Sequence, residues 1–155
     1  MPSFGTGSQN KLNTCHKNII EICNEAIHFV DFSIITGHRT LEEQNALYPK
    51  YTKLKWPDGK HNKLPSLAVD VAPYIKPYGV LFGNDAEIIK MMELTGVSET
   101  EAKTFVQKSY ARLIGIIEGI AFQRNIKIRV GIDWDGDFDM LDQTFHDLGH
   151  WELIE

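Results

Sequence analysis

Apolar residues recur along the chain with two different periods, and these periods predict helices and strands in turn. Residues 12–30 have apolar positions at helical spacing, and a longer amphipathic pattern follows Ser98. The pairs Thr40 with Glu43 and Ser98 with Glu101 have the spacing of a capping box. We therefore expect one helix near the start of the chain, a short helix after Thr40 and a long helix after Ser98.

Strand patterns lie between these helices. The segment "SLAVDVAP", residues 66–73, alternates cleanly, so its two faces differ. One face carries only apolar side chains and the other carries a carboxylate between two alanines: Leu67, Val69 and Val71 against Ala68, Asp70 and Ala72. Shorter β-rich runs are "FSIIT", "KIRVGI" and "HWELI". Strands scattered among helices in this way predict an α+β domain.

The length and the patterns indicate a single domain. A chain of 155 residues is long enough to bury one core, and it shows no internal repeat and no linker. Residues 1–10 are rich in glycine and serine and predict a flexible N-terminus, so the domain is expected over residues 11–155. Residues 49–66 are rich in proline, lysine and glycine and read as a loop. A loop of that length within a compact domain is usually functional.

Charge and hydropathy exclude several classes of protein. The net charge of −5 argues against a nucleic-acid partner, which would require a basic stripe. No apolar run approaches the roughly 20 residues of a membrane helix, and the first residues lack the apolar core of a signal peptide. Cys15 and Cys23, about 12 Å apart on a single helix, are too distant for a disulfide and are expected to be buried thiols. We expect a protein made in the cytoplasm and not inserted in a membrane.

The segment "FHDLGHWEL", residues 145–153, contains two histidines four positions apart. It resembles the H-E-x-x-H zinc helix, with Asp147 in place of glutamate. However, Gly149 disfavours a helix there, and no third ligand follows at the required spacing. The tail alternates as a strand does. We therefore expect His150 to begin a strand and to point the same way as Glu152, with Asp147 reaching the same site from a tight turn.

The other metal ligands are then expected from earlier parts of the chain. Asp70 is a charge on an otherwise apolar strand, and its alanine neighbours leave room for an ion. His61 lies nine residues upstream, across a loop that contains a proline. His61, Asp70 and His150 would form a catalytic zinc set with an open fourth position and a net charge of about +1. Each of these residues also has an interpretation that involves no metal. The aspartate can be hydrogen-bonded to backbone, and a histidine can simply lie at the surface.

A family resemblance brings these residues together. "KHNKLPSLAVDVAPY" followed by "DLGHWEL" resembles the zinc D-alanyl-D-alanine carboxypeptidase and L-alanyl-D-glutamate peptidase family (VanY-like), whose patterns are S-x-H-x-x-G-x-A-x-D and D-x-P-H-[FW]-E. The family includes phage endolysins and shares the Hedgehog fold, which implies a small, mostly antiparallel sheet packed against helices. The resemblance implies zinc ligands at His61, Asp70 and His150, and a catalytic base at Asp147. "TGHRTLEEQ" resembles the family's G-x-R-[ST] stretch and implies substrate binding by Arg39.

The chain departs from this pattern in several places. Nine residues rather than seven separate His61 from Asp70, so the loop holds two extra residues. Gly59, Ser66 and Gly149 stand where the family usually has serine, glycine and proline. His146 matches no ligand position, so we interpret it as a structural or supporting residue. Because loops tolerate changes of length, the insertion affects the shape of the loop more than the choice of ligands.

The resemblance implies a phage-type endolysin that hydrolyses the peptide stems of bacterial peptidoglycan, most readily at the L-alanyl–D-glutamate bond. Made without a signal peptide, it would act on the cell wall after release, as a monomer. One alternative is a D-alanyl-D-alanine carboxypeptidase or dipeptidase, which would use the same metal residues. Another is a non-catalytic zinc-binding module on the same fold, although such a module should lack Asp147 or Arg39.

An acidic run precedes the last motif. Its carboxylates lie within ten residues: Asp133, Asp135, Asp137, Asp139 and Asp142. The start resembles an EF-hand loop, but Gly136 comes before the position at which the sharp turn needs glycine, and Thr144 occupies the position of the bidentate glutamate. Two interpretations stay open. The run is either a solvated acidic turn or a loose calcium site formed by the first four of these aspartates.

Overall fold

The computed structural model describes residues 1–154. The helices are α1 (Thr6–Leu12), α2 (Lys17–Ala26), α3 (Leu41–Leu47), α4 (Asp85–Thr95) and α5 (Glu99–Gln123), with one 3-10 turn, η1 (Lys60–Asn62). The strands are β1 (Phe32–Thr36), β2 (Ala68–Ile75), β3 (Gly79–Val80), β4 (Ile128–Val130) and β5 (His150–Leu153). Among the described residues, no helix is both long and apolar enough to cross a membrane.

The strands form one sheet in the order β1-β2-β5-β4, and the short β3 pairs with β2. Every pairing is antiparallel, so the predicted α+β domain with a small antiparallel sheet is confirmed. The strand β5 comes after all the others in the chain but lies between β2 and β4. Two strands far apart in the sequence, β2 and β5, are therefore direct neighbours at the centre of the sheet.

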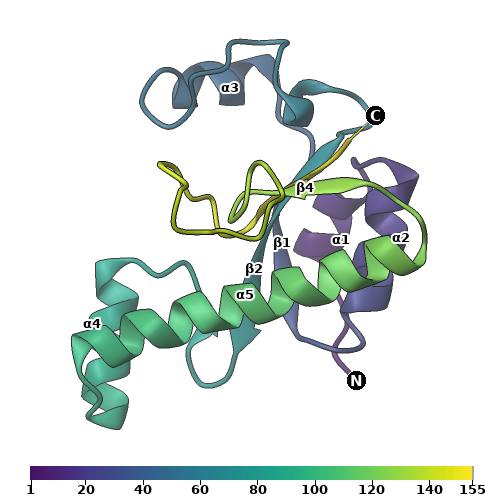
Figure 1. Cartoon of the computed structure of the whole chain (residues 1–155). Helices are drawn as coiled ribbons and strands as arrows, with labels where there is room; N and C mark the ends of the chain where they lie inside the picture. The colour runs from purple at the N-terminus through teal and green to yellow at the C-terminus, as the bar shows by residue number, and fades with distance from the viewer. Residues whose placement is uncertain (155) are drawn as a thin grey trace.

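Helix α5 packs across the sheet and links two hydrophobic clusters (Figure 1). At one end it meets α2, and the larger cluster there includes Ile22, Leu113 and the fully buried Trp151. At the other end it meets α4, around Leu81 and Met91. Helix α3 and the loop after it stand apart from both clusters, at the opposite end of the sheet from α4 (Figure 1). The loop after α3 therefore lies outside the hydrophobic core.

Two glycines allow the chain to approach the central strands closely. A Cβ atom at Gly149 would lie 2.1 Å from the carbonyl oxygen of Val71, on β2. A Cβ atom at Gly131 would lie 2.3 Å from the carbonyl oxygen of Asp147. Both distances are far inside van der Waals contact, so a side chain at either position would displace the segment that leads into β5. Glycine at position 149 therefore fits this close approach.

The N-terminal third differs in part from the sequence expectation. The helix expected over residues 12–30 is shorter, since α1 ends at Leu12 and α2 covers only Lys17–Ala26. His16 begins α2 by accepting a hydrogen bond from the backbone N–H of Asn18. Cys15 forms a β-bridge with Ser66 at the break. Within the stretch expected to be flexible, residues 6–10 belong to α1, where the hydroxyl of Ser8 accepts a hydrogen bond from the backbone of Ile34.

Other features agree with the sequence predictions, but one helix was not predicted. Both capping boxes are present, at the starts of α3 and α5. Cys15 and Cys23 are free and buried, as expected. Helix α4 was not expected from the sequence, although Asn84 caps its start and Gly96, with a φ of 71°, ends it in the left-handed conformation that glycine favours.

Candidate metal centre and active site

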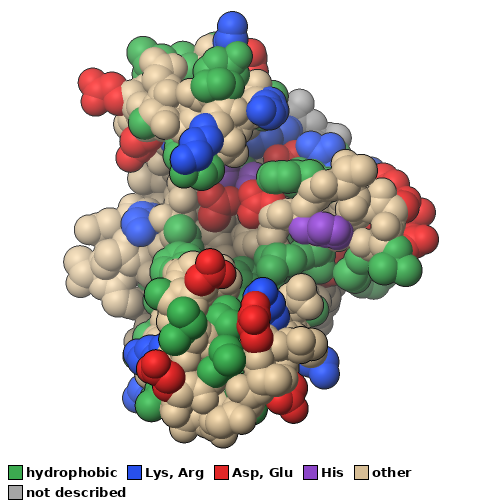
Figure 2. Space-filling view, turned by 90° about the vertical axis from the view of Figure 1, so that its left-hand side faces the viewer, with side chains coloured by type: hydrophobic (Ala, Val, Ile, Leu, Met, Phe, Trp, Pro, Cys, Tyr) green, Lys and Arg blue, Asp and Glu red, His purple; other side chains and the backbone are tan. Residues whose placement is uncertain are grey.

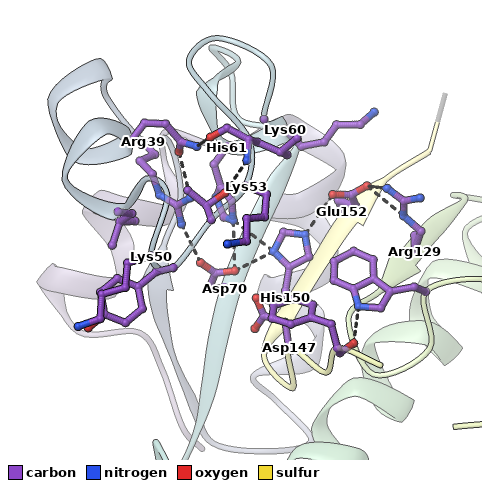
Figure 3. A pocket seen from close by; sticks show the side chains of 18 residues that line it. Arg39, Lys50, Lys53, Lys60, His61, Asp70, Arg129, Asp147, His150 and Glu152 are labelled. Atoms are coloured by element: carbon purple, nitrogen blue, oxygen red, sulfur yellow. Dashed lines mark hydrogen bonds and ion pairs between the residues drawn. The ribbon is translucent and has the colours of Figure 1, made fainter. Parts of the chain in front are cut away.

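Three side chains converge at one end of the central strands. His61 comes from η1, Asp70 from β2 and His150 from the first position of β5 (Figure 3). The distances between their facing atoms are 3.2 Å from His61 Nε2 to Asp70 Oδ1, 2.9 Å from Asp70 Oδ1 to His150 Nδ1, and 3.3 Å from His61 Nε2 to His150 Nδ1. The structure therefore brings together the three residues that the sequence suggested as ligands.

The register of the sheet explains this convergence. Asp70 and His150 are directly opposite each other in the antiparallel pair of β2 and β5, so their side chains leave the same face. His61 is fixed from the other side, because its carbonyl oxygen accepts a hydrogen bond from the backbone N–H of Arg39 at 2.8 Å. The two extra residues between His61 and Asp70 are taken up in the loop, and the side chains still meet.

The outer nitrogen of each imidazole has its own hydrogen-bond partner. His61 Nδ1 lies 2.7 Å from the carbonyl oxygen of Gly37, which can only accept. His150 Nε2 lies 3.1 Å from Oε2 of Glu152, whose other oxygen accepts hydrogen bonds from Arg129. Each outer nitrogen therefore donates, and a neutral ring presents a lone pair toward Asp70. Such outer partners orient histidine ligands in metal sites.

These facing atoms fit a zinc ion. Zinc binds nitrogen and oxygen ligands at about 2.0–2.1 Å in tetrahedral sites, which places neighbouring ligand atoms about 3.3 Å apart. The three separations of 3.2, 2.9 and 3.3 Å are close to that value. In addition, two lone pairs that face each other would repel unless a cation or a proton lay between them. The donor set and its spacing therefore suit one divalent ion with a fourth position open to the cleft.

The pKa values of the metal-free site also fit a bound cation. Burial raises the pKa of Asp70, but hydrogen bonds from His150 and His61 outweigh it and hold this pKa well below its usual range. Burial lowers the pKa of His150, but its bonds to Asp70 and Glu152 raise it to about 9. Without metal, the site therefore holds a proton on His150 at neutral pH, and a metal ion would displace it.

Asp147 and Arg39 flank the three ligands. Asp147 lies in a tight turn in which its carbonyl oxygen accepts a hydrogen bond from the backbone of His150 at 3.1 Å, as the sequence suggested. Burial, and then the charge of Asp70, raise the pKa of the Asp147 carboxyl group. Nη2 of Arg39 lies 3.5 Å from Oδ2 of Asp70, and its Nη1 donates to Gln44, a fully buried residue of α3.

All of these residues line one cleft with a volume of about 670 Å³. Its floor carries histidine and acidic side chains, and Figure 2 shows such side chains recessed between two lobes. One wall is the segment from Leu47 to Leu54. The other is formed by Trp134 and Phe145, whose rings stack at 6.3 Å, and the Trp134 ring also covers that of His150. The volume suits a short peptide segment.

Sequence reasoning did not assign roles to several of these lining residues. Gln44, Arg129, Trp134 and Phe145 carried no motif, and their positions depend on tertiary packing. Glu152 did carry a signal, because it lies two positions after His150 on a strand and must face the same way. The structure places His146 outside the site, on the exposed surface, and the chain forms no helix there, which excludes the H-E-x-x-H geometry.

The acidic run is brought together only in part. Oxygen atoms of Asp133, Asp135 and Asp137 all lie within 4.8 Å of one another, while Asp139 is outside this group. Asp133 is buried and its two oxygens accept backbone hydrogen bonds from Gly136 and Phe138 at 2.9 and 3.0 Å. These backbone bonds use both oxygens of Asp133, and calcium binding by this run stays a prediction.

Comparison with known proteins places the chain in a family. The model of the family described as phage L-alanyl-D-glutamate peptidase matches residues 2–154. The L-alanyl-D-glutamate peptidase of Escherichia phage T5 is 27% identical over 156 residues, which is 97% of this chain and 97% of that protein. The crystal structure of the Serratia marcescens L-Ala D-Glu endopeptidase ChiX has a TM-score of 0.66 and 18% identity, covering 99% of this chain and 91% of that one. The structural likeness supports the fold.

Proposed function

Because this chain belongs to the phage L-alanyl-D-glutamate peptidase family, we propose that it is a zinc-dependent peptidase that cuts the L-alanyl–D-glutamyl bond of peptidoglycan stems. The observation that carries the zinc dependence is the triangle of His61 Nε2, Asp70 Oδ1 and His150 Nδ1, with separations of 3.2, 2.9 and 3.3 Å. Asp147 and Arg39 beside it supply the base and the cation that amide hydrolysis needs.

His61, Asp70 and His150 would hold the ion. When bound, zinc polarises a carbonyl group and lowers the pKa of a water molecule to about 7. Asp147 accepts a proton from the water whose oxygen bonds to the scissile carbonyl carbon. Its raised pKa suits this role, because a stronger base accepts a proton more readily near neutral pH. Asp147 then delivers that proton to the amine nitrogen as the C–N bond breaks.

Arg39 acts on the charge that develops during this step. Its guanidinium group keeps its charge at any working pH, and Gln44 and Asp70 hold it over the cleft. From there it can donate hydrogen bonds to the substrate carbonyl or a neighbouring carboxylate as negative charge accumulates. Loss of one such electrostatic contact typically lowers kcat by about 10²–10³-fold.

Digestion of purified Gram-negative peptidoglycan, followed by mass analysis of the fragments, tests the bond that is cut. We expect new peptides that begin with D-glutamate. Loss of terminal D-alanine instead would identify the alternative carboxypeptidase, which would share the metal residues. Removal of metal with a chelator should abolish cleavage, and added zinc should restore it. Cleavage that survives complete metal removal would contradict the zinc dependence.

A non-catalytic zinc-binding module is the second alternative on this fold. Such a module has no use for a proton acceptor or for a fixed cation beside the ion. Here Asp147 and Arg39 both line the same cleft as the proposed ligands, and the charges of Arg39 and Asp70 act on the pKa of Asp147. We therefore favour the enzyme. Intact peptidoglycan after incubation with the zinc-loaded protein would favour the module.

A further inference from the structure

The wall of the cleft nearest α3 is strongly basic, although the protein as a whole is acidic. Residues 50–63 contain five lysines and a single acidic residue, Asp58, in a chain whose net charge is −5. Three of these lysines line the cleft: Lys50, Lys53 and Lys60. This local excess of positive charge lies beside the proposed metal ligands and calls for a physical reason.

These three lysines are not used to neutralise the protein's own carboxylates. Among residues 1–154 none of them forms an ion pair. The amino group of Lys53 donates only to the carbonyl oxygen of Pro49 at 3.2 Å, and that of Lys50 lies 4.7 Å from the ring centre of Tyr51. The two arginines of the cleft differ, because Arg39 is held by Asp70 and Arg129 by Glu152.

Lys53 is the best placed of the three. In Figure 3 its side chain points from the loop toward the floor of the cleft, while those of Lys50 and Lys60 extend outward. The opposite wall is aromatic, with Phe145 stacked on Trp134. The cleft is therefore polarised across its width, with free cations on one wall and apolar rings on the other. An anionic group of a bound peptide would be attracted to the lysine side.

We propose that Lys53, supported by Lys50 and Lys60, binds the free carboxylate of the D-glutamyl residue that follows the scissile bond. This inference rests on the proposed function, which places a glutamyl residue beside the bond that is cut. A glutamyl residue has two carboxyl groups, and at most one of them continues the chain. Unless it is amidated, the other carboxyl group is a carboxylate one residue from the reacting carbonyl, within reach of a flexible lysine on the adjacent wall.

The test uses two synthetic peptides that contain the L-alanyl–D-glutamyl bond and differ in one group. One peptide keeps the free carboxylate, and the other carries a primary carboxamide there. We expect the zinc-loaded protein to cleave the free acid with a kcat/KM about fivefold higher, the factor that one partly solvated ion pair supports. Lys53→Gln should bring this ratio close to one. High salt should reduce the ratio in the unsubstituted protein, because salt screens exposed charges.

Lys55→Gln is the matched control. Lys55 is on the same loop and has the same charge, but its amino group lies over the ring of Tyr48 and it does not line the cleft. It should keep the ratio of the unsubstituted protein. The inference would be overturned if the unsubstituted protein cleaved both peptides equally, or if Lys53→Gln slowed the cleavage of both equally. Neither outcome would contradict the proposed peptidase activity. Failure to cleave either peptide would contradict the proposed function itself.

Discussion

Glu152 accepts a hydrogen bond from His150 two residues earlier on the same strand, with 3.1 Å between Oε2 and Nε2. Glu152 is only 6% exposed, and Arg129 holds its other oxygen. This carboxylate therefore sets which nitrogen of His150 faces Asp70. Carboxylates in this position raise the basicity of a histidine ligand and fix its orientation.

Glu152→Ala should weaken metal binding by about 10–100-fold, which is the usual effect of losing such a partner. His150 would then be free to rotate and to present either nitrogen. Competition with a chromophoric chelator measures the affinity directly, without any need for substrate. Arg129→Gln is the control, since it leaves the carboxylate in place and should have a smaller effect. Unchanged zinc affinity in Glu152→Ala would show that this hydrogen bond does not orient the ligand.

The pair His61→Ala and His146→Ala tests which histidines bind metal. His61 is 5% exposed with Nε2 directed at the site, whereas His146 is exposed on the surface. We expect His61→Ala to lose both zinc and peptidoglycan cleavage, and His146→Ala to keep both. Metal content by mass spectrometry and turbidity of a cell-wall suspension measure the two properties. If His61→Ala retained zinc and full activity, the ligand assignment would be wrong.

Asp147→Asn should separate chemistry from metal binding. The amide has the shape of the acid but cannot accept the proton, so kcat should fall by about 10²–10⁴-fold. Zinc content and melting temperature should stay near those of the unsubstituted protein, because Asp147 lies beside the three ligands and is not one of them. Loss of zinc together with activity would instead indicate that Asp147 coordinates the ion.

The pKa of His150 gives a pH dependence with a definite sign. The metal-free folded protein has this pKa raised from 6.5 to about 9. Stabilisation from this group is therefore complete below pH 6.5 and is lost as the pH rises through 9. Thermal melting of the chelated protein should show lower stability at pH 9 than at pH 6.5.

The apparent zinc affinity should increase with pH, by about tenfold per pH unit over this range, because the ion displaces one proton from His150. A zinc affinity that is constant with pH would contradict the exchange.

Calcium tests the two interpretations of the acidic run. If Asp133, Asp135 and Asp137 hold an ion, calcium should raise the melting temperature, because binding to the folded state alone stabilises it. The ion would also relieve the repulsion from Asp137 and Asp142, whose charges add to desolvation in raising the pKa of Asp135. Asp135→Asn with Asp137→Asn should remove the response. No response to calcium in stability or activity would leave the solvated acidic turn.

Much of the site was accessible from the sequence because local alternation fixes direction. Asp70 and His150 were each placed on a strand, and on its polar face, from their apolar neighbours, and Val69 and Trp151 are fully buried as that pattern requires. His61 was suggested by its place upstream of Asp70 and by the family resemblance, since nothing in a loop fixes where a side chain points. Local periodicity decides which face a residue occupies, and in this chain that was sufficient for two of the three ligands.

The remaining features depend on contacts between distant segments. The break before α2 coincides with the bridge between Cys15 and Ser66, which no local pattern reveals. The role of Gln44 follows from its burial, where it joins Arg39 to the carbonyl oxygen of Leu54. The order of the strands was also out of reach, because β5 inserts between two strands that precede it. Such pairings are set by the whole core and not by a short window.

The central place of β5 in the sheet has a consequence for how the protein folds. Until this strand is added, β2 and β4 have no common partner, and the sheet is divided into two parts with unpaired inner edges. The same event brings the imidazole of His150 to Asp70 and buries Trp151. Closure of the sheet and completion of the ion-binding pocket are thus one step, so a folding chain should become competent for hydrolysis only when its architecture is finished.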